Sequence, residues 1–242
     1  MLGLEAQRHQ LITERGVFGL VLPDDQSDVL LSFATVMLKE NQVQNLTRIT
    51  EPAAVVTRHL VDSLALLQWH RPAPQDKILD LGTGGGFPGF PLALILPENP
   101  VVLVDSERKK VDFLIRAAAR VGATNVTALH LRAEEAGQNL DLRESQELVT
   151  ARSVASLPVL LEYALPLVKP GGFFVAYKGA EIEDELATAH TALCLLGGRL
   201  HVVHPYKLSS GETHRLIFIE KCNPTPTKYP RNPGIPKKRP LV

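Results

Sequence analysis

Apolar residues recur at helical spacing through the first seventy positions of the chain. One such run covers residues 29–38, and a second repeats in steps of four, four and three at Val56, Leu60, Leu64 and Leu67. The polar stretch NQVQNLTRIT at 41–50 separates the two runs and predicts a loop. Pro52 then suits the first turn of a helix, where its missing N–H group does no harm. We expect residues 1–75 to form a helical extension.

From residue 76 the pattern changes to short apolar runs separated by amphipathic stretches. The apolar runs predict strands at 77–81, 101–105, 126–130, 148–151 and 173–177. The stretches between them predict helices at 91–96, 107–121, 157–168 and 181–196. Alternation of this kind is typical of an α/β fold, in which a parallel sheet is connected by right-handed crossovers.

The last part of the predicted sheet differs from the rest. Two β-rich runs at 200–208 and 216–220 are joined by the turn 209–212, so they should pair as an antiparallel hairpin. A mostly parallel, seven-stranded sheet that closes in such a hairpin is the Rossmann-like fold of class I methyltransferases. We therefore expect a core domain over residues 76–222. Residues 223–242 contain six prolines and no apolar period, which predicts an extended, weakly ordered tail.

Charge and cysteine content narrow the function classes. The whole chain is formally neutral, but residues 221–242 hold six Lys/Arg and no acid, which indicates a local contact with a polyanion. Cys194 and Cys222 are far apart and belong to no metal-binding pattern, so neither a disulfide framework nor a metal site is expected. The chain lacks a signal-peptide pattern and the ~20 apolar residues that span a bilayer. A cytoplasmic protein without a membrane contact fits these features.

The stretch KILDLGTGGGFPG at 77–89 carries the strongest chemical signal. A buried strand that stops at a glycine-rich turn before a helix forms nucleotide-sized pockets in α/β proteins. Gly84, Gly86 and Gly89 satisfy G-x-G-x-x-G, and Asp105 lies 21 residues beyond Gly84, as in NAD-binding enzymes. The same stretch read from Asp80 gives acid-x-Gly-x-Gly, a pattern of enzymes that use S-adenosyl-L-methionine.

Three features favour S-adenosyl-L-methionine over NAD as the cofactor. Asp80 and Asp105 end neighbouring strands, so both carboxylates should face one crevice, where they suit a cationic methionine moiety and a ribose. Pro88 and Pro91 remove amide donors that a pyrophosphate would use. The closing hairpin is also not needed by a dinucleotide-binding fold.

A series of longer motifs resembles one known family. In order, they are NLTRIT at 45–50, RHLVDSL at 58–64, DLGTGGGFPG at 80–89, LVDSERKKVDFL at 103–114, RAEE at 132–135, ARSVASL at 151–157, KG at 178–179, SGETHRLIFIEK at 210–221 and the tail KYPRNPGIPKKRPL. Together they resemble the glucose-inhibited division protein B family over roughly residues 41–241. The resemblance implies an S-adenosyl-L-methionine-dependent methyltransferase that acts on guanine N7 in 16S ribosomal RNA, near the decoding region.

The resemblance also implies the residues of the site. We carry the family's cofactor contacts over to this chain position by position and add the residues of the glycine turn. The expected cofactor contacts are then Asp80, Gly82, Gly84, Phe87, Asp105, Ala133, Glu134 and Arg152. Apart from the resemblance, we hypothesise that a crevice receives the target base and its phosphates and is lined by Asn45, Arg48, His59, Asp62, Arg132, Arg152 and Lys178. The alternative for Asn45, His59 and Asp62 is that they fasten the extension to the core. This chain departs from the family pattern at Thr213-His214-Arg215, so the roles of His214 and Arg215 stay open.

The chemistry of N7 suits this set of residues. Guanine N7 carries a lone pair and no proton, so its methylation needs positioning and exclusion of water but no general base. The basic tail is expected to contact phosphates of the small ribosomal subunit or its RNA. We expect a monomer. Three alternatives remain: a small-molecule or protein methyltransferase on the same fold, an NAD-dependent oxidoreductase, and a non-catalytic RNA-binding assembly factor.

Overall fold

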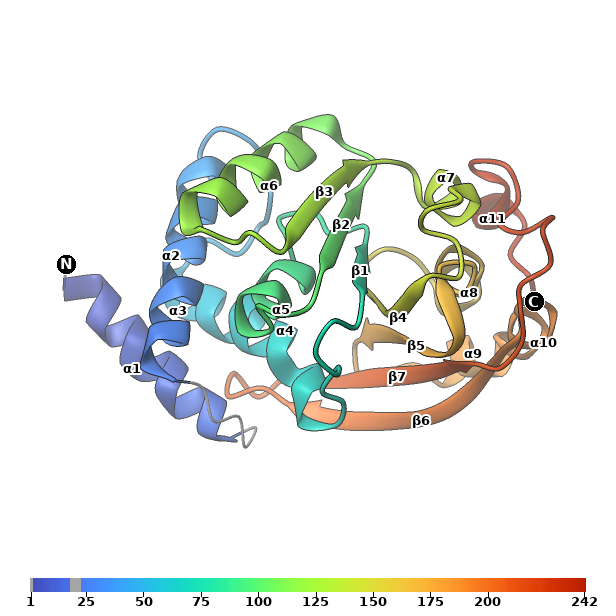
Figure 1. Ribbon diagram of the computed structural model, residues 1–242. Coiled ribbons are helices and arrows are strands. Elements are labelled where there is room, and N and C mark those ends of the chain that lie inside the picture. The colour runs from blue at the N-terminus through green and yellow to red at the C-terminus, as the bar shows by residue number, and fades with distance from the viewer. Residues whose placement is uncertain (1, 18–22) are drawn as a thin grey trace.

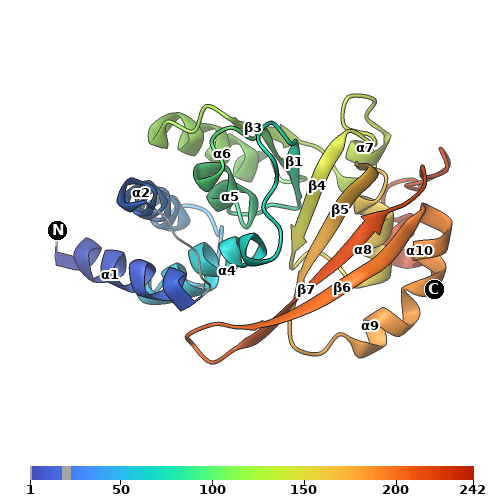
Figure 2. The same cartoon turned by 60° about the horizontal axis from the view of Figure 1, so that its bottom comes forward.

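Seven strands form a single sheet in this computed structural model, which describes residues 2–17 and 23–242 of the chain. The strands are β1 (Ile78–Leu81), β2 (Val101–Asp105), β3 (Val126–His130), β4 (Gln146–Arg152), β5 (Val168–Lys178), β6 (Gly198–Lys207) and β7 (Thr213–Lys221). They lie in the order β3-β2-β1-β4-β5-β7-β6 (Figures 1 and 2). Neighbouring strands are parallel, except that β7 is antiparallel to both β5 and β6. The predicted α/β sheet with a closing hairpin is confirmed.

Helices cover both faces of the sheet. They are α5 (Gly89–Ile95), α6 (Arg108–Val121), α7 (Ala133–Gln138), α8 (Leu157–Ala164), α9 (Glu183–Thr188) and α10 (His190–Leu196). Successive side chains of a strand enter opposite cores, so that Ile78 packs with α5 and α6 whereas Leu79 packs with α8 and α10. Strands buried on both faces read as continuous apolar runs, which is why the sequence located them well.

The N-terminal extension packs on the α5–α6 face. It comprises α1 (Leu2–Val17), α2 (Asp24–Asn41), α3 (Pro52–Val55), a π-helical turn (Val56–Val61), α4 (Asp62–Leu64) and a 3-10 turn (Ala65–Gln68). As predicted, Pro52 begins a helix after a loop, and the Glu51 carboxylate accepts the Ala54 N–H group at 2.7 Å. Phe33 of α2 stacks on Phe90 of α5 with ring centroids 4.0 Å apart. The extension and the sheet therefore share one hydrophobic core.

Two helical expectations differ from the structure. Helix α7 was not predicted, because its six residues show no apolar period and its start is fixed by a capping box in which Glu135 accepts the Arg132 N–H group. The helix expected over 181–196 is divided into α9 and α10, which meet at the buried Ala189. Gly197 ends α10 in the left-handed conformation with φ of 78°.

The expectation of a weakly ordered tail is wrong. Residues 223–242 pack on α7 and α8 and include a helical turn, α11 (Ile235–Lys238). The Arg231 guanidinium donates to the fully buried Glu162 carboxylate at 2.5 and 2.8 Å, and Tyr229 is buried in the core beside α8. Figure 2 shows this segment alongside α7 and α8. Contacts with distant parts of the sequence give the tail an order that its composition does not reveal.

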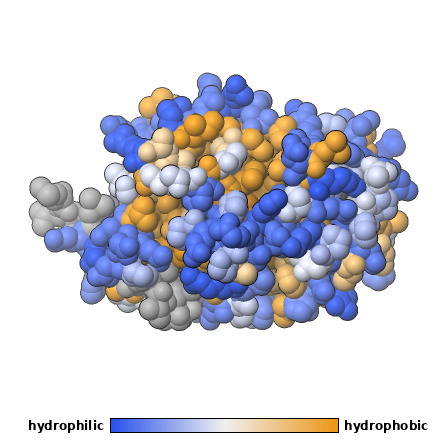
Figure 3. Space-filling view, in the orientation of Figure 1, coloured by the Kyte–Doolittle hydropathy of each residue, from blue (hydrophilic) through white to orange (hydrophobic). Residues whose placement is uncertain are grey.

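The surface of the molecule is mixed. In the orientation of Figure 1, hydrophobic residues gather in the upper middle of the face, and polar residues cover most of the rest (Figure 3). Within residues 2–17 and 23–242, no helix has both the length and the apolar character that a bilayer crossing requires.

Candidate active site

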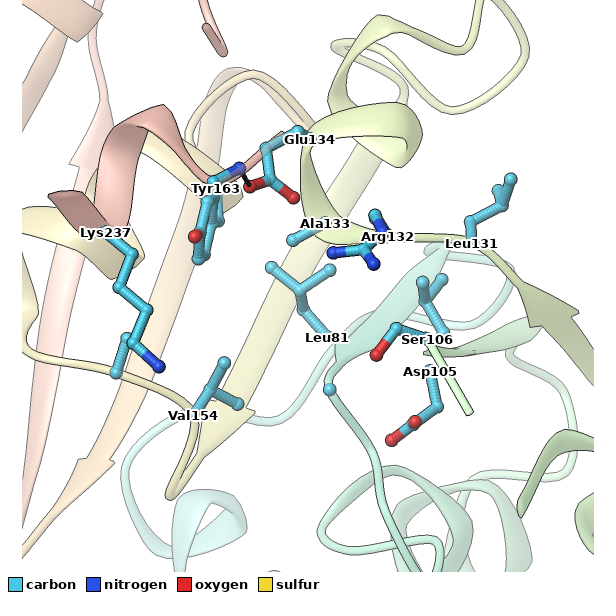
Figure 4. Close-up of a pocket in the computed structure, with 14 residues that line it drawn as sticks. Leu81, Asp105, Ser106, Leu131, Arg132, Ala133, Glu134, Val154, Tyr163 and Lys237 are labelled. Atoms are coloured by element: carbon cyan, nitrogen blue, oxygen red, sulfur yellow. Dashed lines mark hydrogen bonds between the residues drawn. The ribbon is translucent and has the colours of Figure 1, made fainter. Parts of the chain in front are cut away.

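Two cavities lie at the carboxyl ends of the parallel strands, where α/β folds place their ligands. The inner cavity, about 250 Å³, lies between the ends of β1, β2 and β3 and the helices α7, α8 and α11 (Figure 4). The outer cavity, about 950 Å³, lies between the glycine turn, the 46–49 loop and the helix that carries His59. Gly82 and Asp105 line both cavities, so the two spaces meet at the glycine turn.

Gly82 sits at this junction because no other residue fits there. Its φ is +69°, and a Cβ atom on it would come within 2.6 Å of Val154 Cγ2. Gly84 also has a positive φ, and its N–H group donates to Asp105 Oδ2 at 2.8 Å. The predicted Gly82, Gly84 and Asp105 therefore come together at the boundary of the two cavities.

Asp80 is placed differently from the expectation. Its side chain is fully buried beneath the glycine turn, where Oδ2 accepts the Gly89 N–H group and Oδ1 accepts the Thr150 hydroxyl, both at 2.9 Å. Burial raises the pKa of this carboxyl above its ordinary value. Asp80 lines neither cavity, so the structure corrects the expected direct contact with a cofactor: this residue holds the turn in shape from below.

The hydrogen bonds of the turn's N–H groups favour the S-adenosyl-L-methionine pattern over the NAD pattern. The N–H groups of Gly84 and Gly89 donate to carboxylates, and those of Gly86 and Phe87 donate to the Thr83 carbonyl oxygen. A pyrophosphate needs such amides to be free. The turn that matches G-x-G-x-x-G thus lacks the donors of a dinucleotide site at these four positions.

Three predicted residues line the inner cavity at the N-terminal end of α7. They are Arg132, Ala133 and Glu134. Arg132 had been expected in the crevice for the target base, but Figure 4 shows it beside Ser106 and Leu131, on the inner side. Glu134 is buried, and its Oε1 accepts the Gly234 N–H group of the tail at 2.8 Å.

Asp62 is the centre of the polar network beside the outer cavity. Its buried carboxylate accepts hydrogen bonds from Arg152 Nη1 at 2.5 Å, Tyr206 Oη at 2.6 Å and His214 Nδ1 at 3.0 Å. Burial disfavours its charge, but the hydrogen bond from His214, the charge of Arg152 and the Tyr206 hydroxyl hold the pKa of Asp62 below its ordinary value. One carboxylate thereby joins the N-terminal extension to β4, β6 and β7.

The hydrogen bond to Asp62 also raises the pKa of His214 above 6.5. His214 is half-buried and lines the outer cavity. His214 thus places a group that favours the cationic form at the cavity wall.

His59 is held as a neutral ring. Arg152 Nη2 donates to Nδ1 at 3.3 Å, so the proton is on Nε2, which donates to Thr47 Oγ1 at 2.8 Å. Burial, followed by the charge of Arg152, lowers the pKa of His59 to about 3. The ring stacks on Phe87 with centroids 4.3 Å apart and planes 13° from parallel.

Arg152 connects these groups. Besides Asp62 and His59, its guanidinium donates to the Arg58 carbonyl oxygen at 3.0 Å, and it lies 5.5 Å from the centroid of the Phe87 ring. Arg152 and Phe87, both expected at the cofactor, line the outer cavity and not the inner one.

Besides Asp80, two more predicted residues lie outside both cavities. Asn45 is exposed and lines neither cavity, although its neighbours Leu46 and Thr47 line the outer one. The Lys178 ammonium donates to the Ala155 carbonyl oxygen at 2.8 Å and to Glu185 at 2.6 Å. Lys178 therefore fastens the end of β5 to the loop after β4 and to α9.

Several cavity residues were not assigned to the site from the sequence. In the outer cavity they include Arg58 and Lys110, which pair with Glu212 and Glu107 at 2.8 and 2.6 Å. Lys110 belongs to the RKK motif, which could have pointed to it. In the inner cavity they are Val154, Tyr163, Gly234 and Lys237, among others. Burial and the neighbouring Glu134 carboxylate raise the pKa of Tyr163 to about 12. Nothing local in the sequence marks α8 or the tail as part of a cavity.

The described residues contain no candidate metal-binding site. Nowhere in 2–17 and 23–242 do three His, Cys, Asp or Glu side chains converge as a metal site would need.

Sequence comparisons assign the family. The family model described as "rRNA small subunit methyltransferase G" (GidB) matches residues 26–214. The chain is 40% identical to the ribosomal RNA small subunit methyltransferase G of Alkaliphilus metalliredigens over 227 residues, which cover 92% of this chain and 94% of that protein. It is 46% identical to the protein of the same name from Deinococcus radiodurans over 202 residues, covering 83% and 80% of the two chains.

Solved structures share the fold. TrmN from Thermus thermophilus matches with a TM-score of 0.55 and 20% identity, over 76% of this chain and 52% of that one. A mutant of the 16S rRNA (adenine(1408)-N(1))-methyltransferase from Catenulisporales acidiphilia matches with a TM-score of 0.53 and 20% identity, over 62% and 87%. The resemblance in the sequence motifs is thereby confirmed, and this chain belongs to the rRNA small subunit methyltransferase G (GidB) family.

Proposed function

We propose that this protein transfers a methyl group from S-adenosyl-L-methionine to N7 of a guanosine in 16S ribosomal RNA. The observation that carries the proposal is the junction of two cavities at Gly82 and Asp105. One is small and closed by α7 and α8, as a nucleoside site requires. The other is large and partly cationic, as an RNA base and its phosphates require. Relatives at 40–46% identity carry the name ribosomal RNA small subunit methyltransferase G.

The inner cavity fits the adenosine part of the cofactor. Asp105 uses one lone pair on each oxygen for the N–H groups of Gly84 and Glu107, which leaves acceptor capacity for ribose hydroxyls. The side chains of Leu81, Val154 and Tyr163 offer apolar walls for a purine ring. The absence of a Cβ atom at Gly82, where the two cavities meet, leaves room for Val154 in the cavity wall. When bound, the cofactor supplies an electrophilic methyl group on a sulfonium.

The outer cavity suits a reaction that moves no proton. Guanine N7 attacks with its own lone pair, so the protein has only to align it and exclude water. His59 is too weak a base at neutral pH to remove a proton, since its pKa is about 3. Cys194 and Cys222 lie outside this cavity, so the chemistry of a cysteine nucleophile is not supported.

We assign positioning roles to the network around Asp62. Asp62 orients Arg152 and His214, and Arg152 in turn fixes the ring of His59 against Phe87. These contacts hold the wall against which the base would lie. Asn45 and Lys178 receive no direct role, because neither lines a cavity.

The target guanosine must leave any helix to reach this cavity. The major groove of A-form RNA is too deep and narrow for side chains, so N7 is accessible in a loop or in a flipped nucleotide. Arg48 and Lys110 are the cations that we assign to the flanking phosphates. The proposed partner is 16S RNA, free or within the small subunit near its decoding region. The protein would act as a monomer in the cytoplasm, where ribosomes assemble.

One experiment separates this function from its alternatives. Purified full-length protein is incubated with S-adenosyl-L-methionine and either naked 16S RNA or small subunits that lack 7-methylguanosine, and the nucleosides are identified by mass spectrometry. We expect one 7-methylguanosine per RNA. Methylation at another base atom contradicts the N7 assignment. Tight binding of S-adenosylhomocysteine without any methylation of either substrate favours an assembly factor, and binding of NADH in its place favours the oxidoreductase.

A further inference from the structure

The tail of the chain forms one wall of the inner cavity. Gly234 and Lys237 line it together with Tyr163 of α8 and Glu134 of α7. In Figure 4 Lys237 extends from α11 past Tyr163 toward Val154, on the side of the cavity opposite Asp105. The family model ends at residue 214, so this wall lies outside the part of the chain that the model matches.

Two buried carboxylates fix the position of this wall. Glu162 accepts the Arg231 guanidinium at 2.5 and 2.8 Å and also the Arg231 N–H group at 2.9 Å. Glu134 accepts the Gly234 N–H group at 2.8 Å. Since Glu134 and Tyr163 themselves line the cavity, α11 is held by the same elements that form the site.

A third set of contacts fixes the beginning of the tail. The Arg143 guanidinium donates to the carbonyl oxygens of Thr225 and Tyr229, both at 2.8 Å, and Gln138 donates to the Pro230 carbonyl oxygen at 3.0 Å. Gln138 belongs to α7, and Arg143 belongs to the segment that follows it. The tail therefore stands in a defined place before any ligand enters.

Lys237 differs from the arginine of the same segment. The Arg231 guanidinium forms an ion pair with Glu162. The Lys237 ammonium, in contrast, makes no hydrogen bond or ion pair with the residues that the structure describes. An ammonium group has three donors and no acceptor. Adenosine offers acceptors at its ring nitrogens and ribose oxygens, so the chemistry of the cavity and that of Lys237 are complementary.

We propose that Lys237 is a cofactor-binding residue and that residues 231–238 form the wall that retains the adenosine moiety. The inference rests on the proposed function, because it takes the inner cavity as the adenosine site. It also reverses the expected role of the tail: this segment serves the cofactor first, and any phosphate contact is left to the outward-facing cations. By linkage, the bound cofactor must stabilise the position of the tail to the same extent as the tail stabilises the cofactor.

The test compares two neighbouring lysines of α11 in the full-length protein. Lys237→Met keeps the apolar stem and removes the ammonium. Lys238→Met is the matched control, since both lysines are exposed but only Lys237 lines the inner cavity. Binding of S-adenosylhomocysteine is measured by calorimetry. We expect Lys237→Met to weaken it about tenfold, the loss of one hydrogen bond to a charged group, and Lys238→Met to change it less than about twofold.

A second measurement does not depend on affinity alone. Amide hydrogen exchange of residues 228–242 is followed with and without saturating S-adenosylhomocysteine. We expect the ligand to slow exchange there in the wild type and in Lys238→Met, and to slow it less in Lys237→Met. Two results would overturn the inference and leave the proposed function intact. One is equal affinity of the three proteins for S-adenosylhomocysteine, and the other is an amide exchange rate of residues 228–242 that the ligand does not change. If the wild type itself fails to bind S-adenosylhomocysteine, the proposed function is wrong as well.

Discussion

The Asp62 carboxylate accepts a hydrogen bond from the Arg152 guanidinium at 2.5 Å, although the two residues are 90 positions apart in the sequence. Asp62 belongs to the N-terminal extension and Arg152 ends β4. Both side chains are almost entirely buried, so this pair also fixes the extension to the sheet. The wall of the outer cavity depends on this junction.

The first prediction concerns the several hydrogen bonds that the Arg152 guanidinium donates. Lysine at this position keeps the charge but cannot donate to Asp62, His59 and the Arg58 carbonyl oxygen together. We expect Arg152→Lys to reduce methyl transfer about 10- to 100-fold and to change the affinity for S-adenosylhomocysteine by less than about threefold. Single-turnover kinetics and calorimetry measure the two quantities. A loss of ligand affinity as large as the loss of transfer would assign Arg152 to the cofactor.

The neutral His59 makes stability depend on pH. Because its pKa is lowered from 6.5 to about 3 in the folded protein, the unfolded chain binds the extra proton between these values. The contribution of His59 to stability is therefore complete above pH 6.5 and is lost as the pH falls. Between pH 6.5 and 5 the loss is about 2 kcal/mol.

The matched variant for this measurement is His59→Gln, which cannot titrate. Urea unfolding at pH 7 and pH 5 should show a larger decrease for the wild type than for the variant, by about 2 kcal/mol. His214 and the carboxylates are present in both proteins, so their titration cancels in the comparison. Equal decreases would mean that His59 is not held neutral.

The glycine at the junction of the cavities can be compared with a glycine of similar backbone conformation elsewhere. Gly82 and Gly122 have φ of 69° and 74°, but a Cβ atom would meet Val154 at Gly82 and no atom within 4 Å at Gly122. Alanine at either position should cost about 1–2 kcal/mol of stability through the backbone. Gly82→Ala should in addition weaken binding of S-adenosylhomocysteine at least about tenfold, because Val154 must move into the inner cavity. Similar affinities in the two variants would show that the space at Gly82 is not needed for the ligand.

Arg48 provides a test of RNA contacts. It is exposed at the outer cavity, whereas Arg199 is an exposed arginine on β6, paired with Glu220 and outside both cavities. We expect Arg48→Ala to weaken binding of 16S RNA and to reduce the salt dependence of binding by about one phosphate, a slope change of about 0.7–0.9. Arg199→Ala should leave both quantities unchanged. The measurement is a salt titration of RNA affinity, and identical slopes for all three proteins would exclude Arg48 as a phosphate contact.

The parts of the structure that follow from local pattern were predictable. The strands at 101–105 and 126–130 agree residue for residue with β2 and β3, because a short β-rich run bounded by turns is visible in the sequence both for the buried β2 and for β3 at the edge of the sheet. The closing hairpin was likewise marked by its turn residues. The glycine turn pointed to the place of the two cavities, since Gly82 and Asp105 line both of them.

The parts that depend on distant contacts were not predictable. Asp80 follows an apolar run and precedes a glycine turn, a pattern that does not distinguish a carboxylate above the turn from one below it. Lys178 lies at a strand end, but its ammonium pairs with Glu185 and lines neither cavity. The tail is the largest example, because its order depends on Glu162 and Arg143, 69 and more than 80 positions away.

The contribution of the tail makes the inner cavity depend on a segment that lies outside the sheet. Gly234 and Lys237 line this cavity, and Glu134 of α7 holds the Gly234 N–H group. If these residues separate from α7 and α8, the cavity loses a wall although every strand of the sheet stays paired. Under the proposed function, local opening of the tail would therefore release the cofactor without unfolding the protein.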